Sequence, residues 1–443
     1  FPVLGGFQSA NRGGAVYSQD GVLLKFSPDL STRLFSTYIG GSGNDAAYVV
    51  SLNPSNNNIY VAGGTESTDL PGTGAGTISS SNNGGIDGFV SIVSNDGSTL
   101  IKTTYIGTGG IDQVYGIQFD KFNFPYVMGQ TTGSWPVLNA AWSQPGGKQF
   151  IAKLQPDLSA YAYSTCFGKG DPFPDISPVA FLVDRCENVY VSGWGGWDGG
   201  NYKNSGVQGL PVTPDAIKST PDFNPNTHHG QDFYFFVLEK NARSQLYGSF
   251  FGQNGGTIGD HVDGGTSRFD RNGVIYQAIC SNCGNTLPFP TTPGAWATAK
   301  PPSANCNLAM VKISFDFSGV RSGVQSLING VPRDTAGCVP LTVDFRDTAQ
   351  LAVSYEWNFG DGTPQLATTT PSTSHTYNTV GTYRVMLVAI DSTTCNIRDT
   401  SYLNIKVGDV EAKLDVNIKK LDPCTAFKYQ FDNLSTAPAG AAF

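Results

Sequence analysis

The chain has 443 residues, only 14% of them charged, with 54 glycines, 27 phenylalanines, 19 tyrosines and 3 methionines. This length supplies cores for two or three domains, and the composition favours short strands and turns over helices. The formal net charge is −8 and the sequence contains no block of Lys and Arg, so a nucleic-acid partner is not expected. No apolar run is long enough to cross a bilayer, so a membrane span is not expected either.

The first segment with a functional interpretation is "STYIGGSGNDAAYVV", Ser36 to Val50. A glycine-rich loop after an apolar strand can cradle a phosphate, gather metal ligands or turn the chain. The same order of strand, glycine turn, Asp and strand recurs from Thr103, Ser164 and Gly248. A phosphate cradle is expected once, at the start of a helix, and no helical periodicity follows. We therefore interpret the segment as a turn between the second and third strands of a repeated unit.

Strands such as "GVLLKFS" precede the repeated segment, and strands such as "NIYVAGG" follow it. Motifs such as "FPVLGGFQ" and "WPVLNAAW" close each unit. Four short strands per unit, in a fixed order, predict an all-β protein with a β-propeller of four-stranded blades over residues 1–318. About five units are visible, and those at both ends lack strands. Earlier residues that complete the ring, or whole blades upstream, are therefore expected.

The repeats resemble the SBBP-type propeller repeats of bacterial surface proteins. The family signatures "YLGGSGND" and "VYVTGTT…FP" correspond here to Tyr38–Asp45 and Ile59–Pro71. Units three and four, with "YVSGWGG" and "CSNCG", resemble a subtype found beside PKD domains in exported surface proteins of gliding-type Bacteroidetes. The resemblance implies a cargo-like protein of type IX secretion, located on the bacterial cell surface and exported by a signal outside these residues.

The pattern changes from about Asn329 onwards. Alternating apolar residues in "VSYEWNFGDGT" and "TYRVMLVAID" predict an immunoglobulin-like sandwich over residues 326–408. This part resembles a PKD domain, whose structural motif is carried here by Trp357, Gly360, Asp361, Gly362, His375, Tyr377, Gly381 and Tyr383. Residues 409–443 resemble the truncated start of a second such domain.

Eight cysteines, mostly spread singly, are typical of structural disulfides in an oxidising, extracellular setting. Cys338 and Cys395 flank the PKD-like strands, and a bridge between them would add about 4 kcal/mol in the chain-entropy estimate. Cys166 and Cys186 are placed to meet within a single blade. A disulfide from Cys306 to Cys280 or Cys283 is favoured over a zinc site, because a single CxxC is a weak metal signal.

The recurring carboxylates Asp45, Asp112, Asp175 and Asp260 have two interpretations. They can line a channel and bind calcium, or they can accept hydrogen bonds from the backbone amides of a repeated turn. The second is favoured because no EF-hand loop occurs, so no cofactor is expected and calcium remains the alternative.

The segment "GWGGWDGGNYKN" is the candidate ligand-binding surface. Aromatic rings on a glycine-rich loop can stack on a sugar or anchor a protein, with polar neighbours as hydrogen-bonding groups. The candidate residues are Trp194, Trp197, Asp198, Asn201, Tyr202 and Asn204. The alternative is that Trp194 and Trp197 fill the propeller core.

No motif of nucleophilic or metal-dependent hydrolysis occurs, so no catalytic residue is expected. The predicted function is non-enzymatic adhesion, recognition or assembly at the cell surface, with the propeller as binding head and the PKD-like domains as stalk. Surface glycans or proteins are the expected partners. The alternatives are a lectin-like glycan-binding module, a self-assembling subunit of a surface fibre, and a propeller hydrolase or lyase.

Overall fold

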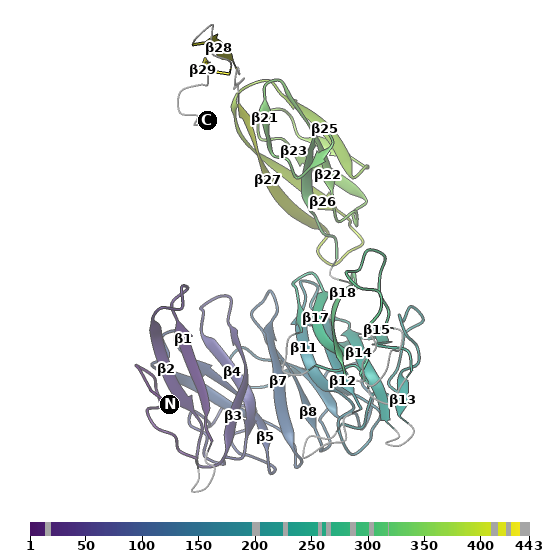
Figure 1. Ribbon diagram of the computed structural model, residues 1–443. Coiled ribbons are helices and arrows are strands. Elements are labelled where there is room, and N and C mark those ends of the chain that lie inside the picture. Colours follow the sequence, from purple (N-terminus) through teal and green to yellow (C-terminus); the bar gives the residue numbers. More distant parts are fainter. Residues whose placement is uncertain are drawn as a thin grey trace. The chain divides into compact units, whose positions relative to one another are not determined.

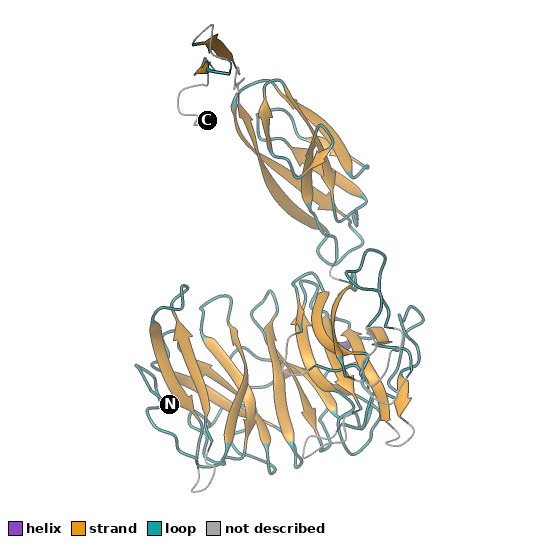
Figure 2. Cartoon of the chain, in the orientation of Figure 1, coloured by secondary structure: helices purple, strands orange, loops and turns teal. Residues whose placement is uncertain are grey.

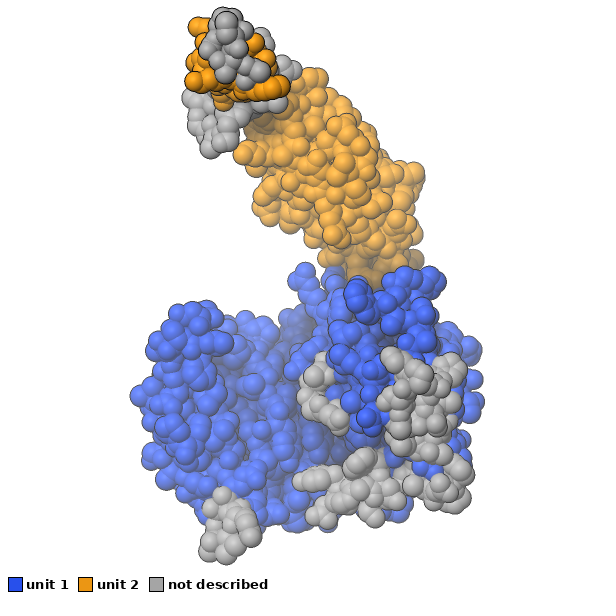
Figure 3. Space-filling model, in the orientation of Figure 1, with its two compact units in different colours: residues 1–318 blue, residues 319–443 orange. Residues whose placement is uncertain are grey.

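The computed structural model describes all residues except 14–18, 197–203, 225–228, 256–258, 263–266, 284–288, 301–304, 318, 409–414, 422–426 and 435–443. The chain forms two compact units, residues 1–318 and 319–443 (Figure 3). Strands dominate both, and a short 3-10 turn, Lys240–Ala242, is the sole helical element among the described residues (Figure 2). The predicted all-β fold class is confirmed. No helix in the described ranges is long and apolar enough to cross a membrane.

The first unit is a succession of antiparallel sheets (Figure 1). A two-stranded sheet of β1 (Gly21–Phe26) and β2 (Arg33–Ile39) comes first. The next two sheets each have four strands in chain order: β3 (Asp45–Leu52), β4 (Ile59–Thr65), β5 (Asp87–Val93) and β6 (Leu100–Ile106), then β7 (Asp112–Phe119), β8 (Pro125–Thr131), β9 (Gln149–Leu154) and β10 (Tyr161–Phe167).

The fourth and fifth sheets follow the same order. The fourth contains β11 (Ser177–Val183), β12 (Val189–Gly195), β14 (His229–Leu238) and β15 (Gln245–Phe251), with the short β13 (Asp222–Asn224) added beside β14. The fifth contains β16 (Arg268–Phe269), β17 (Val274–Ser281) and β18 (Asn307–Ser314). The opening strands of successive sheets lie side by side, since β3 contacts β7, β7 contacts β11 and β11 contacts β16.

The core of the first unit is divided into layers between neighbouring sheets. In β8, Tyr126 and Met128 pack toward the fourth sheet, whereas Val127 packs toward the second. In β12, Val189 and Val191 face the third sheet and Tyr190 faces the fifth. Because side chains alternate along a strand, a sheet between two others must be apolar on both faces. This explains the nearly continuous apolar runs of the second strands.

The glycine-rich segments connect different sheets, which corrects the prediction of a turn within one unit. The first segment joins β2, which pairs with β1, to β3, which pairs with β4. Each complete sheet therefore combines the last two strands of one sequence repeat with the first two of the next. The strands themselves follow the predicted order, but hydrogen bonding groups them differently.

The second unit is an immunoglobulin-like sandwich of two sheets. One sheet has the order β20-β19-β22-β25 and the other β21-β27-β26-β23-β24. The strands are β19 (Val324–Ile328), β20 (Val331–Pro332), β21 (Ala336–Cys338), β22 (Leu341–Asp347), β23 (Ser354–Asn358), β24 (Leu366–Thr368), β25 (Ser372–Tyr377), β26 (Gly381–Ile390) and β27 (Arg398–Gly408).

The sandwich core has the predicted alternation. Leu341, Val343 and Phe345 of β22 are buried together with Tyr355 and Trp357 of β23. In the segment after the sandwich, β28 (Val416–Lys420) and β29 (Tyr429–Asn433) pair as an exposed antiparallel hairpin.

Candidate functional sites

The recurring Asp residues occupy equivalent places at the four connections between sheets. Each is almost completely buried and accepts a backbone N–H through Oδ2. The donor is always the second residue after the preceding strand: Gly41 for Asp45 at 2.7 Å, Thr108 for Asp112 at 2.7 Å, Lys169 for Asp175 at 3.1 Å, and Gln253 for Asp260 at 2.5 Å. These contacts are those of a turn acceptor.

Side-chain hydroxyl groups also donate hydrogen bonds to some of these carboxylates. Asp45 accepts hydrogen bonds from Thr65 and from Ser67, the latter at 2.8 Å, and Asp112 accepts one from Thr108 at 2.8 Å. A calcium ion needs six to eight oxygen ligands and would have to replace such N–H and O–H donors. The contacts of the described residues therefore suit a structural role, and calcium binding stays an untested alternative.

The glycine that directly follows the last strand of a sheet, as Gly40 and Gly107 do, packs against carboxylate groups. A Cβ on Gly40 would stand 2.6 Å from Asp20 Oδ1 and 2.7 Å from Asp45 Oδ2, and one on Gly107 would stand 2.5 Å from Asp87 Cγ. Real Cβ atoms do not come so close to other atoms. The recurring glycine is thus required by close approach of the backbone to buried Asp side chains, which is the physical reason for the motif.

Burial controls the electrostatics of the connections. Desolvation raises the pKa of Asp87 to about 6, although the Asn83 N–H lowers it and the nearby Asp112 carboxylate raises it. Desolvation also raises the pKa of Asp260 to about 6 against the backbone hydrogen bonds from Gln253 and Asn282. In a low dielectric the charged carboxylate is disfavoured, so these groups hold protons at mildly acidic pH.

Other connections contain a donor beside the carboxylate. The Gln149 amide donates to Asp175 Oδ2 at 2.9 Å, and the Lys218 ammonium lies 2.9 Å from Asp232 Oδ2 next to the Asp260 connection. The chain thus compensates buried carboxyl groups in several ways.

Trp194 lies in β12 opposite Phe233 and is half-buried against the core between the fourth and fifth sheets. Its ring centroid is 5.6 Å from that of His261. Asn204 is buried and accepts the N–H of Gly196 at 2.7 Å. The other members of the predicted ligand-binding set, Trp197, Asp198, Asn201 and Tyr202, lie outside the described residues.

Two predicted disulfide pairs are wrong. Cys166 is a free buried thiol whose Sγ donates to Gln144 O at 3.3 Å, and it packs between the second and third sheets. Cys186 lies between β11 and β12 of the fourth sheet, on the other side of the third. The prediction places both residues within one blade, but the actual grouping of strands separates them.

Cys338 is a thiol as well, so the Cys338–Cys395 pair is not formed. Cys338 pairs with Gly408 at the end of β27, whereas Cys395 precedes the start of the same strand. A strand of 11 residues is on the order of 30 Å long, too far for a disulfide.

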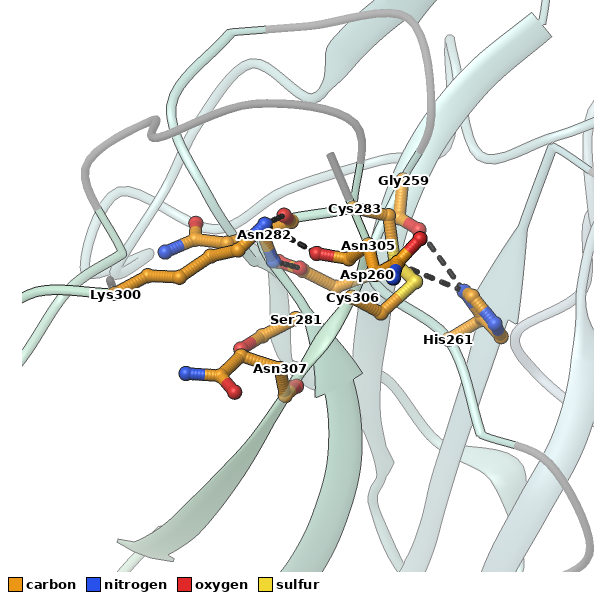
Figure 4. The surroundings of a disulfide bond; sticks show 10 residues. All are labelled: Gly259, Asp260, His261, Ser281, Asn282, Cys283, Lys300, Asn305, Cys306 and Asn307. Carbon is orange, nitrogen blue, oxygen red and sulfur yellow. Dashed lines mark hydrogen bonds between the residues drawn. A yellow bond between two sulfur atoms is a disulfide. The ribbon is translucent and has the colours of Figure 1, made fainter. Parts of the chain in front are cut away.

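The predicted bridge from Cys306 to the CxxC motif is confirmed as a Cys283–Cys306 disulfide (Figure 4). Sequence spacing could not reveal that His261 lies beside it, with its Nδ1 4.0 Å from Cys283 Sγ. The ligand atoms of His261, Cys283 and Cys306 all lie within 4.8 Å of one another. A backbone bridge between His261 and Cys280 creates this proximity.

The residues of the PKD-like motif form a tight corner of the sandwich. Gly360 and Gly362 have φ angles of 78° and 87°, which only glycine adopts easily. Between them, Asp361 Oδ2 lies 2.7 Å from His375 Nε2, and the His375 ring stacks on Phe359 with centroids 4.0 Å apart.

Two tyrosines complete this corner through their hydroxyl groups. Tyr377 donates to Phe359 O at 3.1 Å, and Tyr383 donates to Thr379 O at 2.7 Å, near Gly381. Burial raises the pKa of Asp361, but hydrogen bonds from Thr363 and His375 outweigh it, so that the pKa lies below its ordinary value.

Comparison with known protein families finds a match within the second unit. Residues 326–407 match the family model of the PKD domain. No curated protein matches the chain.

Several solved structures align with much of the chain at very low similarity. One described as the extracellular domain of a one component system from B. thetaiotaomicron has 9% identity and a TM-score of 0.20, covering 88% of this chain and 67% of the other. A second from B. thetaiotaomicron, described as the extracellular domain of a hybrid two component system, has 9% identity, a TM-score of 0.17 and coverages of 87% and 70%. A europium-containing methanol dehydrogenase has 10% identity, a TM-score of 0.23 and coverages of 82% and 76%. At these TM-scores the alignments carry no argument about fold or function.

Proposed function

We propose that this chain is a non-enzymatic protein of the bacterial cell exterior that acts in adhesion, recognition or surface assembly. In this proposal the first unit is a propeller-type binding head related to SBBP repeats, and the PKD-like unit is a stalk. The observation that supports it most is the PKD family match at 326–407, joined to a first unit of repeated antiparallel sheets. A disulfide in the first unit suits an extracellular location.

The blade arrangement is supported by the side-by-side opening strands of successive sheets and by the apolar layers between the sheets. Among the described residues, β1–β2 and β16–β17–β18 form separate sheets with fewer than four strands. In a propeller, long connections on such a rigid scaffold are the natural recognition elements.

A non-enzymatic role is favoured by how the described connection carboxylates are used. They are buried and accept hydrogen bonds from the backbone and from hydroxyls, rather than lining an open cleft. The alternatives are a propeller hydrolase or lyase, or a subunit that assembles into a fibre.

A lectin-like site on the 197–204 segment is the most specific version of the proposal. Trp194 packs against the core, and Asn204 fixes the returning chain through Gly196 and Ser177. The Trp197 to Tyr202 stretch lies between these two anchors in sequence, with two further aromatic residues among glycines. Aromatic rings in such a segment can stack on a sugar ring.

A binding screen tests the proposal. The purified chain is screened against glycan arrays and isolated bacterial surface material, next to the double variant Trp197→Ala, Tyr202→Ala. The control is Trp296→Ala, which removes a fully exposed Trp on another connection. We expect binding that drops at least tenfold in the double variant and stays unchanged in Trp296→Ala. Turnover of a bound glycan would contradict the non-enzymatic role, and equal loss in both variants would exclude this segment as the site.

A further inference from the structure

The His261–Cys283–Cys306 cluster lies where the long connection between β17 and β18 leaves the sheet. The last paired residues of the two strands are Ser281 and Asn307. Cys283 follows Ser281 by two positions, and Cys306 directly precedes Asn307. The disulfide therefore joins the two ends of this connection, which we call its neck (Figure 4). Lys300 also fastens the neck, because its ammonium group donates to the carbonyls of Asn282 and Asn305.

His261 is held on the other side of β17. The backbone N–H of His261 donates to the backbone carbonyl of Cys280 at 3.1 Å, and the backbone N–H of Cys280 donates to the carbonyl of His261 at 2.9 Å. Residues that exchange both hydrogen bonds in an antiparallel pair have side chains on the same face, so the Cys280 and His261 side chains share a face. The His261 ring is turned toward the disulfide, with Nδ1 3.1 Å from Gly259 O and 4.0 Å from Cys283 Sγ (Figure 4).

This set has the ligand chemistry of a thiophilic metal site. One imidazole nitrogen and the two disulfide sulfurs lie within 4.8 Å of one another. The thiol of Cys280 belongs to the same CxxC motif as Cys283. Zinc sites use Cys and His ligands, and these commonly include two cysteines with two residues between them. Zinc–sulfur bonds of about 2.3 Å require sulfurs that are not bonded to each other. The disulfide must therefore open first.

We propose that His261, Cys283 and Cys306 bind a thiophilic divalent cation such as Zn²⁺ when the disulfide between the two cysteines is reduced. A dithiol or phosphine supplies the two electrons and is oxidised to a disulfide or, with oxygen from water, to a phosphine oxide. The two cysteine sulfurs take up two protons and release them to solvent as thiolates when the cation binds. His261 coordinates through Nδ1, which requires its ring to give up the Nδ1 contact with Gly259 O and to carry its proton on Nε2.

The consequence is that the two ends of the connection between β17 and β18 can be joined in two ways, by the disulfide or by a bound cation. In the oxidised chain a covalent bond joins Cys283 to Cys306, and in the reduced chain the cation joins the same residues. Both close the same loop and thus restrict the unfolded chain similarly. The inference does not depend on the proposed surface function, because it concerns a single connection of the fifth sheet.

Metal binding by the full chain tests the inference. The chain is reduced with a phosphine, transferred to oxygen-free buffer and titrated with Co²⁺, whose thiolate charge-transfer absorption reports sulfur ligands, and then with Zn²⁺. We expect about one cation per reduced chain, with Zn²⁺ displacing Co²⁺, and none in the oxidised chain. We also expect Zn²⁺ to raise the melting temperature of the reduced chain.

Three variants locate the site. Cys283→Ser and His261→Gln should each weaken Co²⁺ binding at least tenfold, whereas Cys166→Ser, which removes a buried thiol in a different sheet, should leave it unchanged. Circular dichroism establishes that each variant is folded before titration. The inference is overturned if the reduced native chain shows no thiolate absorption with Co²⁺, or if the absorption persists undiminished in Cys283→Ser and His261→Gln.

Discussion

Single glycines at the sheet connections are set by contacts with buried carboxyl groups. Gly107 lies against Asp87, whereas a Cβ on Gly109, two residues further in the same connection, would meet no atom within 4 Å. We expect Gly107→Ala to lower the free energy of unfolding by about 1–3 kcal/mol, as overpacking does, and Gly109→Ala to change it by less than about 0.5 kcal/mol. Chemical denaturation measures both. Equal effects of the two substitutions would show that the close approach is not what selects glycine.

Protonation of Asp87 is a second effect at the residue scale. Burial raises its pKa from 3.8 to about 6 in the fold, so its contribution to stability is complete below pH 3.8 and is lost as the pH rises through about 6. Asp87→Asn keeps an acceptor for the Asn83 N–H and removes the titration. We expect it to stabilise the chain relative to native more at pH 8 than at pH 5, measured by denaturation at both pH values.

Asp96 provides the opposite case as a control. Hydrogen bonds from Ser94 and Ser98 lower its pKa to about 2, so it is ionised in both the folded and unfolded chain between pH 5 and 8. Asp96→Asn should therefore have the same effect at both pH values. An unchanged pH dependence in Asp87→Asn would show that this carboxyl group titrates normally.

At the scale of elements, the start of β23 separates core from surface. Alternation would place Val353 on the same face as the buried Tyr355 and Trp357, but it lies outside the strand. Trp357 is fully buried and donates through Nε1 to Thr368 Oγ1 at 3.1 Å, while Val353, directly before the strand, is exposed. Trp357→Ala should lower the stability of the second unit by about 3–5 kcal/mol, and Val353→Ala by less than about 0.5 kcal/mol. Urea denaturation of residues 319–408 measures this, and a small effect of Trp357→Ala would remove that residue from the core.

Strands were easier to predict from sequence than their grouping into sheets. Alternating or continuous apolar runs, as in β22 and β8, depend on local burial and are visible in a window of a few residues. Whether β2 hydrogen-bonds to β1 or to β3 depends on how the chain folds back, which repeated strand types leave open. The same limit applies to the candidate site. Spacing predicted that Cys306 bonds to Cys280 or Cys283, but the choice of Cys283 and the approach of His261, through its bridge with Cys280, depend on the fold.

At the scale of the whole molecule, the two units should respond differently to pH. The raised carboxyl pKa values of about 6 at Asp87 and Asp260 belong to the first unit, whereas in the second unit the pKa values of Asp361 and Asp391 are lowered. From pH 5 to 8 the first group loses its protons in the fold, and the second is already ionised in both states. We therefore expect calorimetry to show that the melting temperature of the first unit falls by several degrees from pH 5 to pH 8, since each kcal/mol lost lowers it by ~2–4 °C. The melting temperature of the second unit should change less.

The assignment of the two transitions can be checked with residues 319–408 alone, whose melting should coincide with the less pH-sensitive transition. A single transition for the full chain, or two that shift together, would contradict independent responses.

The interleaved packing of the second strands has a consequence for cooperativity. Because Val127 and its neighbours Tyr126 and Met128 belong to different layers, removing the third sheet would expose apolar faces on both the second and the fourth. Stability then depends on nearest neighbours, as in repeat proteins, and the third sheet is protected by two interfaces. Viable insertions or losses of repeats should therefore come in whole sheets, with connection length free to vary.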